Sequence, residues 1–87
     1  MSEEEKNSVF NMYSSNLKRQ NEIKRMISDC ESINDTIKAK LEAETDADQI
    51  NRLCDMLEMN QKNYKKLQEE WAILLKELNA LNEKYED

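Results

Sequence analysis

The sequence predicts an all-α protein, an antiparallel two-helix coiled-coil hairpin that assembles further into a helical bundle. The 87 residues include no glycine or proline, and 37% are charged whereas only 6% are aromatic, a composition typical of exposed helices. Apolar residues recur at spacings of three and four through both halves of the chain, as in coiled-coil helices. The pattern is interrupted only at residues 42–49, so we expect one helical domain over residues 1–87.

The second half of the chain has the most regular pattern and predicts a helix over residues 47–85. Five unbroken heptads run from Ile50 to Tyr85, with Asn60 as their single polar member. A buried amide can fix pairing register or oligomeric state at some cost in stability. We therefore expect Asn60 to specify the pairing. The predicted inward residues are Ile50, Leu53, Leu57, Asn60, Tyr64, Leu67, Trp71, Leu74, Leu78, Leu81 and Tyr85.

The first half predicts a helix over residues 3–43, which begins after Ser2 with three acidic residues facing the positive end of the helix dipole. Its apolar pattern changes register between Leu17 and Ile23, which are six positions apart rather than seven. We interpret residues 16–21 as a stammer in one helix, and a joint between two shorter helices is the alternative. The predicted inward residues are Phe10, Tyr13, Leu17, Ile23, Met26, Cys30, Ile33, Ile37 and Leu41.

A turn is predicted at residues 43–47, because Thr45 and Asp46 each begin a segment that resembles a capping box. If the chain folds back there, inward residues of the two halves face each other at a nearly constant sum of residue numbers. Cys30 and Asn60, for example, would then face each other. An uninterrupted helix in a domain-swapped antiparallel homodimer would make the same contacts. The capping residues favour the hairpin.

Several apolar residues lie outside the predicted seam. A hairpin of two helices makes a thin core, so we expect these residues to form a second contact surface that binds a partner. We also expect Trp71 to face the polar segment near Arg19 and Gln20, where a guanidinium group can stack on the indole. The predicted partner-binding residues are Val9, Met12, Met56, Met59, Trp71, Ile73 and Leu75.

The composition argues against catalysis and predicts a protein without cofactors, metal sites or a small-molecule substrate. There is no histidine to activate Cys30 or Cys54, and the acidic clusters lack the glycine and ligand spacing of a calcium loop. A net charge of −6 argues against nucleic-acid binding. No apolar run is long enough for a membrane span or a signal peptide. We therefore expect an intracellular protein of the cytoplasm, with the nucleus as the alternative location.

These observations predict a non-enzymatic interaction protein, a small coiled-coil scaffold or assembly subunit that pairs with itself or with a helical partner. The alternative is an acidic inhibitory or chaperone-like protein that masks a partner's helix or basic surface. Salt distinguishes the two, because it screens charged surfaces more than apolar seams. A belt of basic residues could bind an acidic partner or the acidic tail of a neighbouring copy. It comprises Lys18, Arg19, Lys24, Arg25, Lys62, Lys65 and Lys66.

Overall fold

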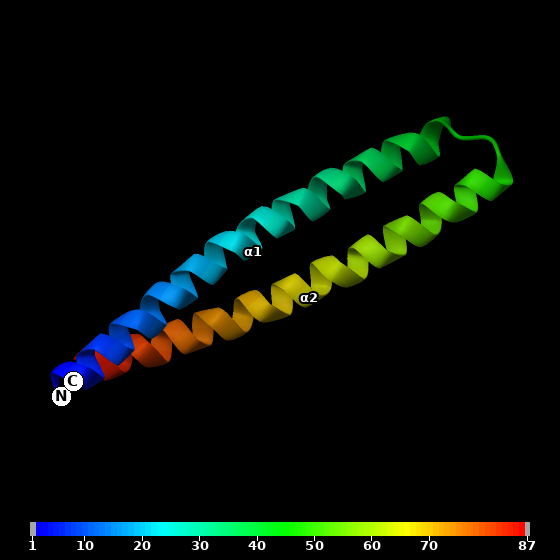
Figure 1. The fold of residues 1–87 in the computed structure, drawn as a ribbon. Helices are drawn as coiled ribbons and strands as arrows, with labels where there is room; N and C mark the ends of the chain where they lie inside the picture. The colour runs from blue at the N-terminus through cyan, green and yellow to red at the C-terminus, as the bar shows by residue number, and fades with distance from the viewer. Residues whose placement is uncertain (1, 87) are drawn as a thin grey trace.

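The computed structural model describes residues 2–86 and shows two long helices packed antiparallel as a hairpin (Figure 1). Helix α1 spans Glu3–Ala43 and helix α2 spans Ala47–Glu86. The hairpin measures 66 × 15 × 15 Å. Both ends of the described chain lie together, and the turn lies at the far end of the molecule. The predicted antiparallel hairpin is confirmed.

Side chains cap the beginnings of both helices. The Ser2 hydroxyl accepts a hydrogen bond of 3.2 Å from the backbone N–H of Glu5. At the turn, the carboxylate of Asp46 accepts one of 3.0 Å from the N–H of Asp48, and the Glu44 carboxylate accepts from the N–H groups of Thr45 and Asp46. Each bond satisfies an N–H that the helix or turn leaves without a backbone partner. The chain therefore reverses without glycine, and no described residue needs a positive φ.

Apart from the half-buried Arg19 and Glu22, which form an ion pair with each other, the buried and half-buried residues of α1 follow one uninterrupted pattern of three and four. Helix α1 is continuous through residues 16–21, so the predicted single helix is confirmed and the alternative joint is not present in the described helix. The predicted stammer is wrong, because the spacing of the seam residues does not change in this segment. The polar residues Asn16 and Gln20 hold the seam positions there, at 5% and 8% exposure. The seam residues are Val9, Tyr13, Asn16, Gln20, Ile23, Ile27, Cys30, Asn34, Ile37 and Leu41.

This register corrects four of the predicted inward residues of α1. Phe10, Leu17, Met26 and Ile33 are exposed at 64%, 38%, 43% and 47%, respectively. Each is the neighbour in sequence of a true seam residue, one step of about 100° around the helix. They therefore flank the seam instead of filling it.

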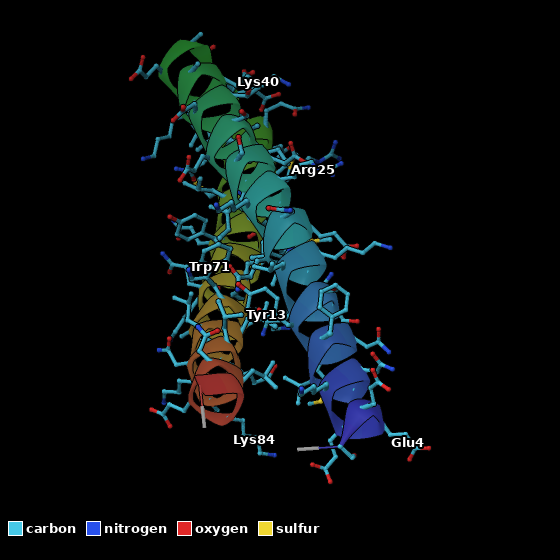
Figure 2. All side chains as sticks on the ribbon, turned by 90° about the vertical axis from the view of Figure 1, so that its left-hand side faces the viewer. Glu4, Tyr13, Arg25, Lys40, Trp71 and Lys84 are labelled. Carbon is cyan, nitrogen blue, oxygen red and sulfur yellow. The ribbon has the colours of Figure 1, made fainter. Side chains whose placement is uncertain are left out.

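The predicted seam of α2 is confirmed for the residues whose side chains the structure describes. Leu74, Leu81 and Asn60 are buried, and the other predicted inward residues from Ile50 to Leu78 are half-buried. The predicted inward residue Tyr85 lies outside the described side chains. Side chains project from the whole circumference of both helices (Figure 2). Only a narrow strip of each helix is covered by the other, which leaves a thin core.

Candidate protein-interaction site

Two hydrogen bonds between side-chain amides and backbone carbonyls join the helices across the seam. The Asn60 amide donates to the carbonyl of Cys30 at 2.8 Å, and the Asn16 amide donates to the carbonyl of Leu74 at 2.9 Å. The residue numbers sum to 90 in both pairs, so the two helices keep one register over this length. The predicted pairing of Cys30 with Asn60 is confirmed. Asn16 replaces Leu17 as the residue that meets Leu74.

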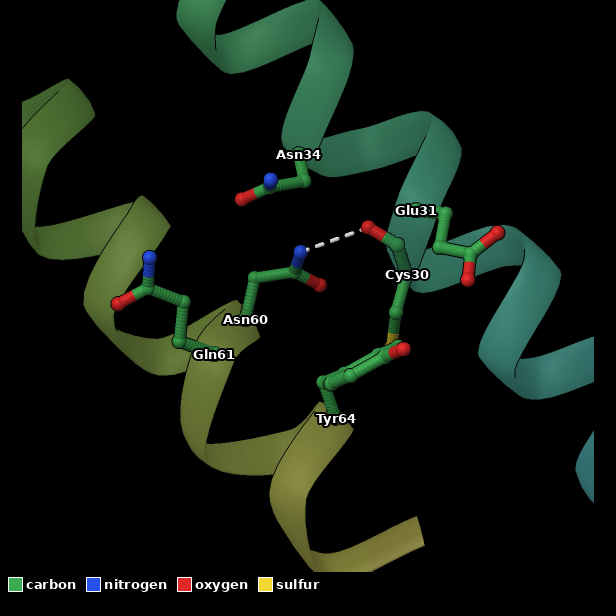
Figure 3. Close-up of a pocket in the computed structure, with 6 residues that line it drawn as sticks. All are labelled: Cys30, Glu31, Asn34, Asn60, Gln61 and Tyr64. Carbon is green, nitrogen blue, oxygen red and sulfur yellow. Dashed lines mark hydrogen bonds between the residues drawn. The ribbon is translucent and has the colours of Figure 1, made fainter. Parts of the chain in front are cut away.

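A pocket of about 300 Å³ interrupts the seam beside Asn60 (Figure 3). Cys30, Asn34 and Tyr64 line it together with Asn60, and the amides of Asn34 and Asn60 project into the space between the helices. The Asn34 side-chain oxygen is buried and accepts no hydrogen bond within the described structure. A buried polar atom without a partner destabilises the fold. This part of the seam is therefore polar and incompletely packed.

The seam divides the surface into two long faces. Residues that directly follow a seam residue and lie three positions before the next one, such as Phe10, Leu17, Lys24 and Leu75, turn toward one face, here called the Phe10 face. In antiparallel helices the corresponding steps turn toward the same side. The contacts agree, because Lys24 of α1 and Gln68 of α2 line one depression beside Trp71.

The opposite face, here called the Met26 face, is formed by residues that directly precede a seam residue and lie three positions after the previous one. Its exposed apolar residues are Met12, Met26, Ile33 and Met56. Ile33 of α1 and Met56 of α2 line one groove of about 220 Å³ with the seam residues Ile37 and Leu53. Arg19 lies on the same face.

A bidentate ion pair joins α1 to α2 on the Met26 face. The guanidinium of Arg19 donates to both carboxylate oxygens of Glu70, at 2.8 and 3.1 Å, and to Glu22 at 3.0 Å. The hydrogen bonds to Glu70 and Glu22 raise the pKa of Arg19, and the hydrogen bond from Arg19 lowers the pKa of Glu70. Bidentate pairing of this kind fixes geometry as well as charge.

The predicted stacking of Arg19 near Trp71 is therefore wrong, because the carboxylates engage this guanidinium. The ammonium of Lys24 instead lies 5.5 Å from the centre of the Trp71 ring. This distance is within the range of a cation–π interaction. The contact places a cation on the Phe10 face.

The predicted partner-binding residues are not brought together into one surface. Val9 and Trp71 are half-buried in the seam, and Leu75 lies on the Phe10 face. Met12 and Met56 lie on the Met26 face. Their role in binding stays a prediction. Met59 and Ile73, which are 67% and 56% exposed, each lie two positions after a seam residue and point farther outward.

Sequence reasoning missed Phe10, Leu17, Met26 and Ile33 as exposed residues because it assigned them to the seam. An available signal was the spacing of Tyr13, which continues through Asn16, Gln20 and Ile23 by steps of three, four and three. This register places polar residues in the seam, and the apolar residues next to them in sequence then lie outside it.

Charge is segregated along the hairpin. The middle segment, residues 16–28 and 62–74, contains seven basic and three acidic residues. The turn end, residues 29–61, contains nine acidic and three basic residues, and the open end, residues 1–15 and 75–87, contains seven acidic and three basic residues. A basic middle thus lies between two acidic ends. The constant register of the seam brings the two parts of the middle segment side by side.

Within residues 2–86 there is no group of three or more metal-ligating side chains. In the same part of the chain, neither helix has an apolar stretch able to cross a membrane. Comparison with protein-family models, curated proteins and solved structures finds nothing that matches this chain.

Proposed function

We propose that the hairpin is a non-enzymatic protein–protein interaction module, a small coiled-coil scaffold or assembly subunit that completes a helical bundle with a second polypeptide. The observation that carries the proposal is the set of large apolar side chains left exposed beside the seam. In helical bundles, positions flanking the two-helix seam are those that a further helix covers. Seven exposed apolar residues flank the seam, namely Phe10, Met12, Leu17, Met26, Ile33, Met56 and Leu75, whereas Met59 and Ile73 point farther outward.

The thin core gives a second reason for a partner. Among the described residues, five apolar side chains are buried, and of these Ile23 alone is fully inaccessible. Burial of apolar surface is the main favourable contribution to folding, and two helices alone bury little of it. A partner that binds only the folded hairpin stabilises it by mass action. Binding and folding stability are therefore coupled in this proposal.

The second candidate function is an acidic masking protein, an inhibitory or chaperone-like binder of a partner's basic surface. The turn end supports it, because nine acidic residues stand there against three basic ones. Attraction between exposed charges weakens as salt screens it, whereas apolar burial does not weaken in this way. A complex that dissociates between about 0.05 and 0.5 M salt favours masking. A complex that survives favours the scaffold.

The proposal is tested by photo-crosslinking in cells that express the chain. A photoreactive phenylalanine analogue replaces Phe10 on one face or Ile33 on the other, and the control carries it at Lys76, which is exposed and two positions away from the seam residues on either side. We expect discrete protein adducts from Phe10 or Ile33 and a weaker, diffuse background from position 76. Adducts no stronger than those of the control at both apolar positions would contradict an interaction function.

A further inference from the structure

One stripe of α1 has an ordered sequence of chemical types. Glu3, Phe10, Leu17 and Lys24 are seven residues apart and all exposed, so they follow one another along the Phe10 face. The order is acid, apolar, apolar, base. Two copies of this stripe placed antiparallel are complementary, because an acidic residue faces a basic one at each end and apolar residues face each other between them.

We propose that a second copy of this chain docks antiparallel on the Phe10 face, with Phe10 of each copy against Leu17 of the other. In this register Glu3 of each copy faces Lys24 of the other, and the two-fold axis passes between Tyr13 and Ser14. Such an interface is isologous and closes as a dimer. The inference rests on the proposed function and names the partner.

Helix α2 supplies the rest of the apolar centre. The hydrogen bond from Asn16 to the Leu74 carbonyl places the next residues, Leu17 and Leu75, close together on the Phe10 face, offset by about 3 Å along the hairpin. A depression of about 260 Å³ lies beside Phe10, lined by Val9, Tyr13 and Asn82. It offers a place for Leu17 of the second copy.

The charge distribution selects this register. Docking about the axis near Tyr13 lays the acidic open end of each copy against the basic middle segment of the other, so the net charges attract. Lys24 is already held above Trp71, on the face where the second copy's Glu3 arrives. The basic belt thereby acquires an acidic partner from within the same sequence.

The Met26 face also has a stripe, in which Met12, Met26 and Ile33 lie between Glu5 and Lys40. Its own matching register would centre the dimer between Glu22 and Ile23. That axis stacks the two basic middle segments on each other, and like charges repel. It also brings Arg19, already bound to Glu70, into an apolar centre. The Met26 face is therefore the less suitable site for a second copy.

The size of the overlap predicts a weak dimer. The two copies overlap over about 24 residues, or about 36 Å at 1.5 Å per residue, and the hairpin is 15 Å wide. This gives a footprint of about 500 Å² per copy and about 1,000 Å² in total, near the lower limit for a specific interface. We expect a dissociation constant on the order of tens of micromolar.

The first test is sedimentation equilibrium of the full chain from about 1 µM to 1 mM, a range that brackets the expected constant. The mass should rise from 10.4 kDa toward twice that value. Phe10→Glu should weaken the dimer by roughly tenfold or more. Ile33→Glu, its control on the opposite face, should leave the constant within about twofold. Both residues are exposed, and circular dichroism verifies that the variants remain helical.

The second test determines the register. Glu3→Lys and Lys24→Glu should each weaken self-association, because each places like charges together. An equimolar mixture of the two variants should form a heterodimer, because lysines then meet glutamates at both ends of the interface. No rescue in the mixture would overturn the register.

A chain that stays monomeric to 1 mM, or a dimer that Ile33→Glu dissociates and Phe10→Glu does not, would overturn the second copy as occupant. In the monomeric case, adducts between position 33 and other proteins would leave the proposed interaction function standing. Absence of both the dimer and the adducts would remove the proposed function as well.

Discussion

The side-chain amide of Asn60 on α2 donates a hydrogen bond of 2.8 Å to the backbone carbonyl of Cys30 on α1. A backbone carbonyl inside a helix already accepts a bond from the N–H four residues later. The Asn60 bond is therefore an addition that only the correct alignment of the two helices permits. It makes the alignment specific without being needed to complete α1.

Replacing Asn60 with leucine should raise the thermal midpoint while making the oligomeric state heterogeneous. Leucine would bury apolar surface beside the pocket, whereas the amide contributes mainly specificity. A gain of about 1 kcal/mol would raise the midpoint by roughly 4–8 °C in a chain of this size. Circular dichroism and light scattering on the same samples measure both effects. A single species of lower stability would disprove this role of Asn60.

Asn34→Leu should increase the free energy of unfolding by about 1 kcal/mol or more, because it removes the buried oxygen that has no partner. Urea unfolding followed by circular dichroism measures the change. Asn63→Leu is the matched control at an exposed position and should change the free energy by less than about 0.5 kcal/mol. Equal effects of the two substitutions would mean that burial at position 34 is unimportant.

The two cysteines should react with a thiol reagent at very different rates. Cys54 is exposed and Cys30 is buried in the seam, and buried thiols react slowly. Peptide mass spectrometry during labelling should show Cys54 modified at least roughly tenfold faster. Denaturant should bring the two rates together. Similar rates in buffer alone would contradict the packing of α1 on α2.

Glu70 should make the stability of the hairpin depend on pH in the acid range. Its pKa is lowered in the folded state by the hydrogen bond from Arg19. The resulting stabilisation is present above the unfolded pKa of about 4.3 and disappears as the pH falls through the lower folded value. Glu70→Gln should therefore lower the melting temperature at pH 7 but have little effect near pH 2.

Glu69→Gln serves as the control for this comparison, because Glu69 is exposed. Melting curves at both pH values check the sign of the effect. A constant difference between wild type and Glu70→Gln at both pH values would contradict a contribution from the ionised pair.

The sequence identified α2 better than α1, and the reason lies in particular residues. Along α2 the seam is apolar except at Asn60, so hydrophobic periodicity follows burial directly. Along α1, Asn16 and Gln20 are buried because they hydrogen-bond to the Leu74 carbonyl and to each other. A pattern of apolar residues does not reveal polar residues that are buried together with their hydrogen-bond partners.

The prediction of the interaction site was affected by the same error in the register of α1. Once Phe10 and Leu17 were assigned to the seam, the Phe10 face lost the residues that give it a stripe. Lys24 appeared only as a member of a basic belt, and its contact with Trp71 depends on the relative rotation of the helices. That rotation follows from how two seams pack, which one helix's sequence does not specify.

The hairpin places the turn 66 Å from the end where the two helices begin and finish. If the open end is fixed to a partner, a small rotation of the hairpin about that end displaces the acidic turn by a much larger distance. The rigidity of the hairpin depends on the seam, because the Cys30–Asn60 and Asn16–Leu74 bonds resist sliding of one helix along the other. A contact made near Phe10 would thus determine the position of the distant turn as well as fix the open end.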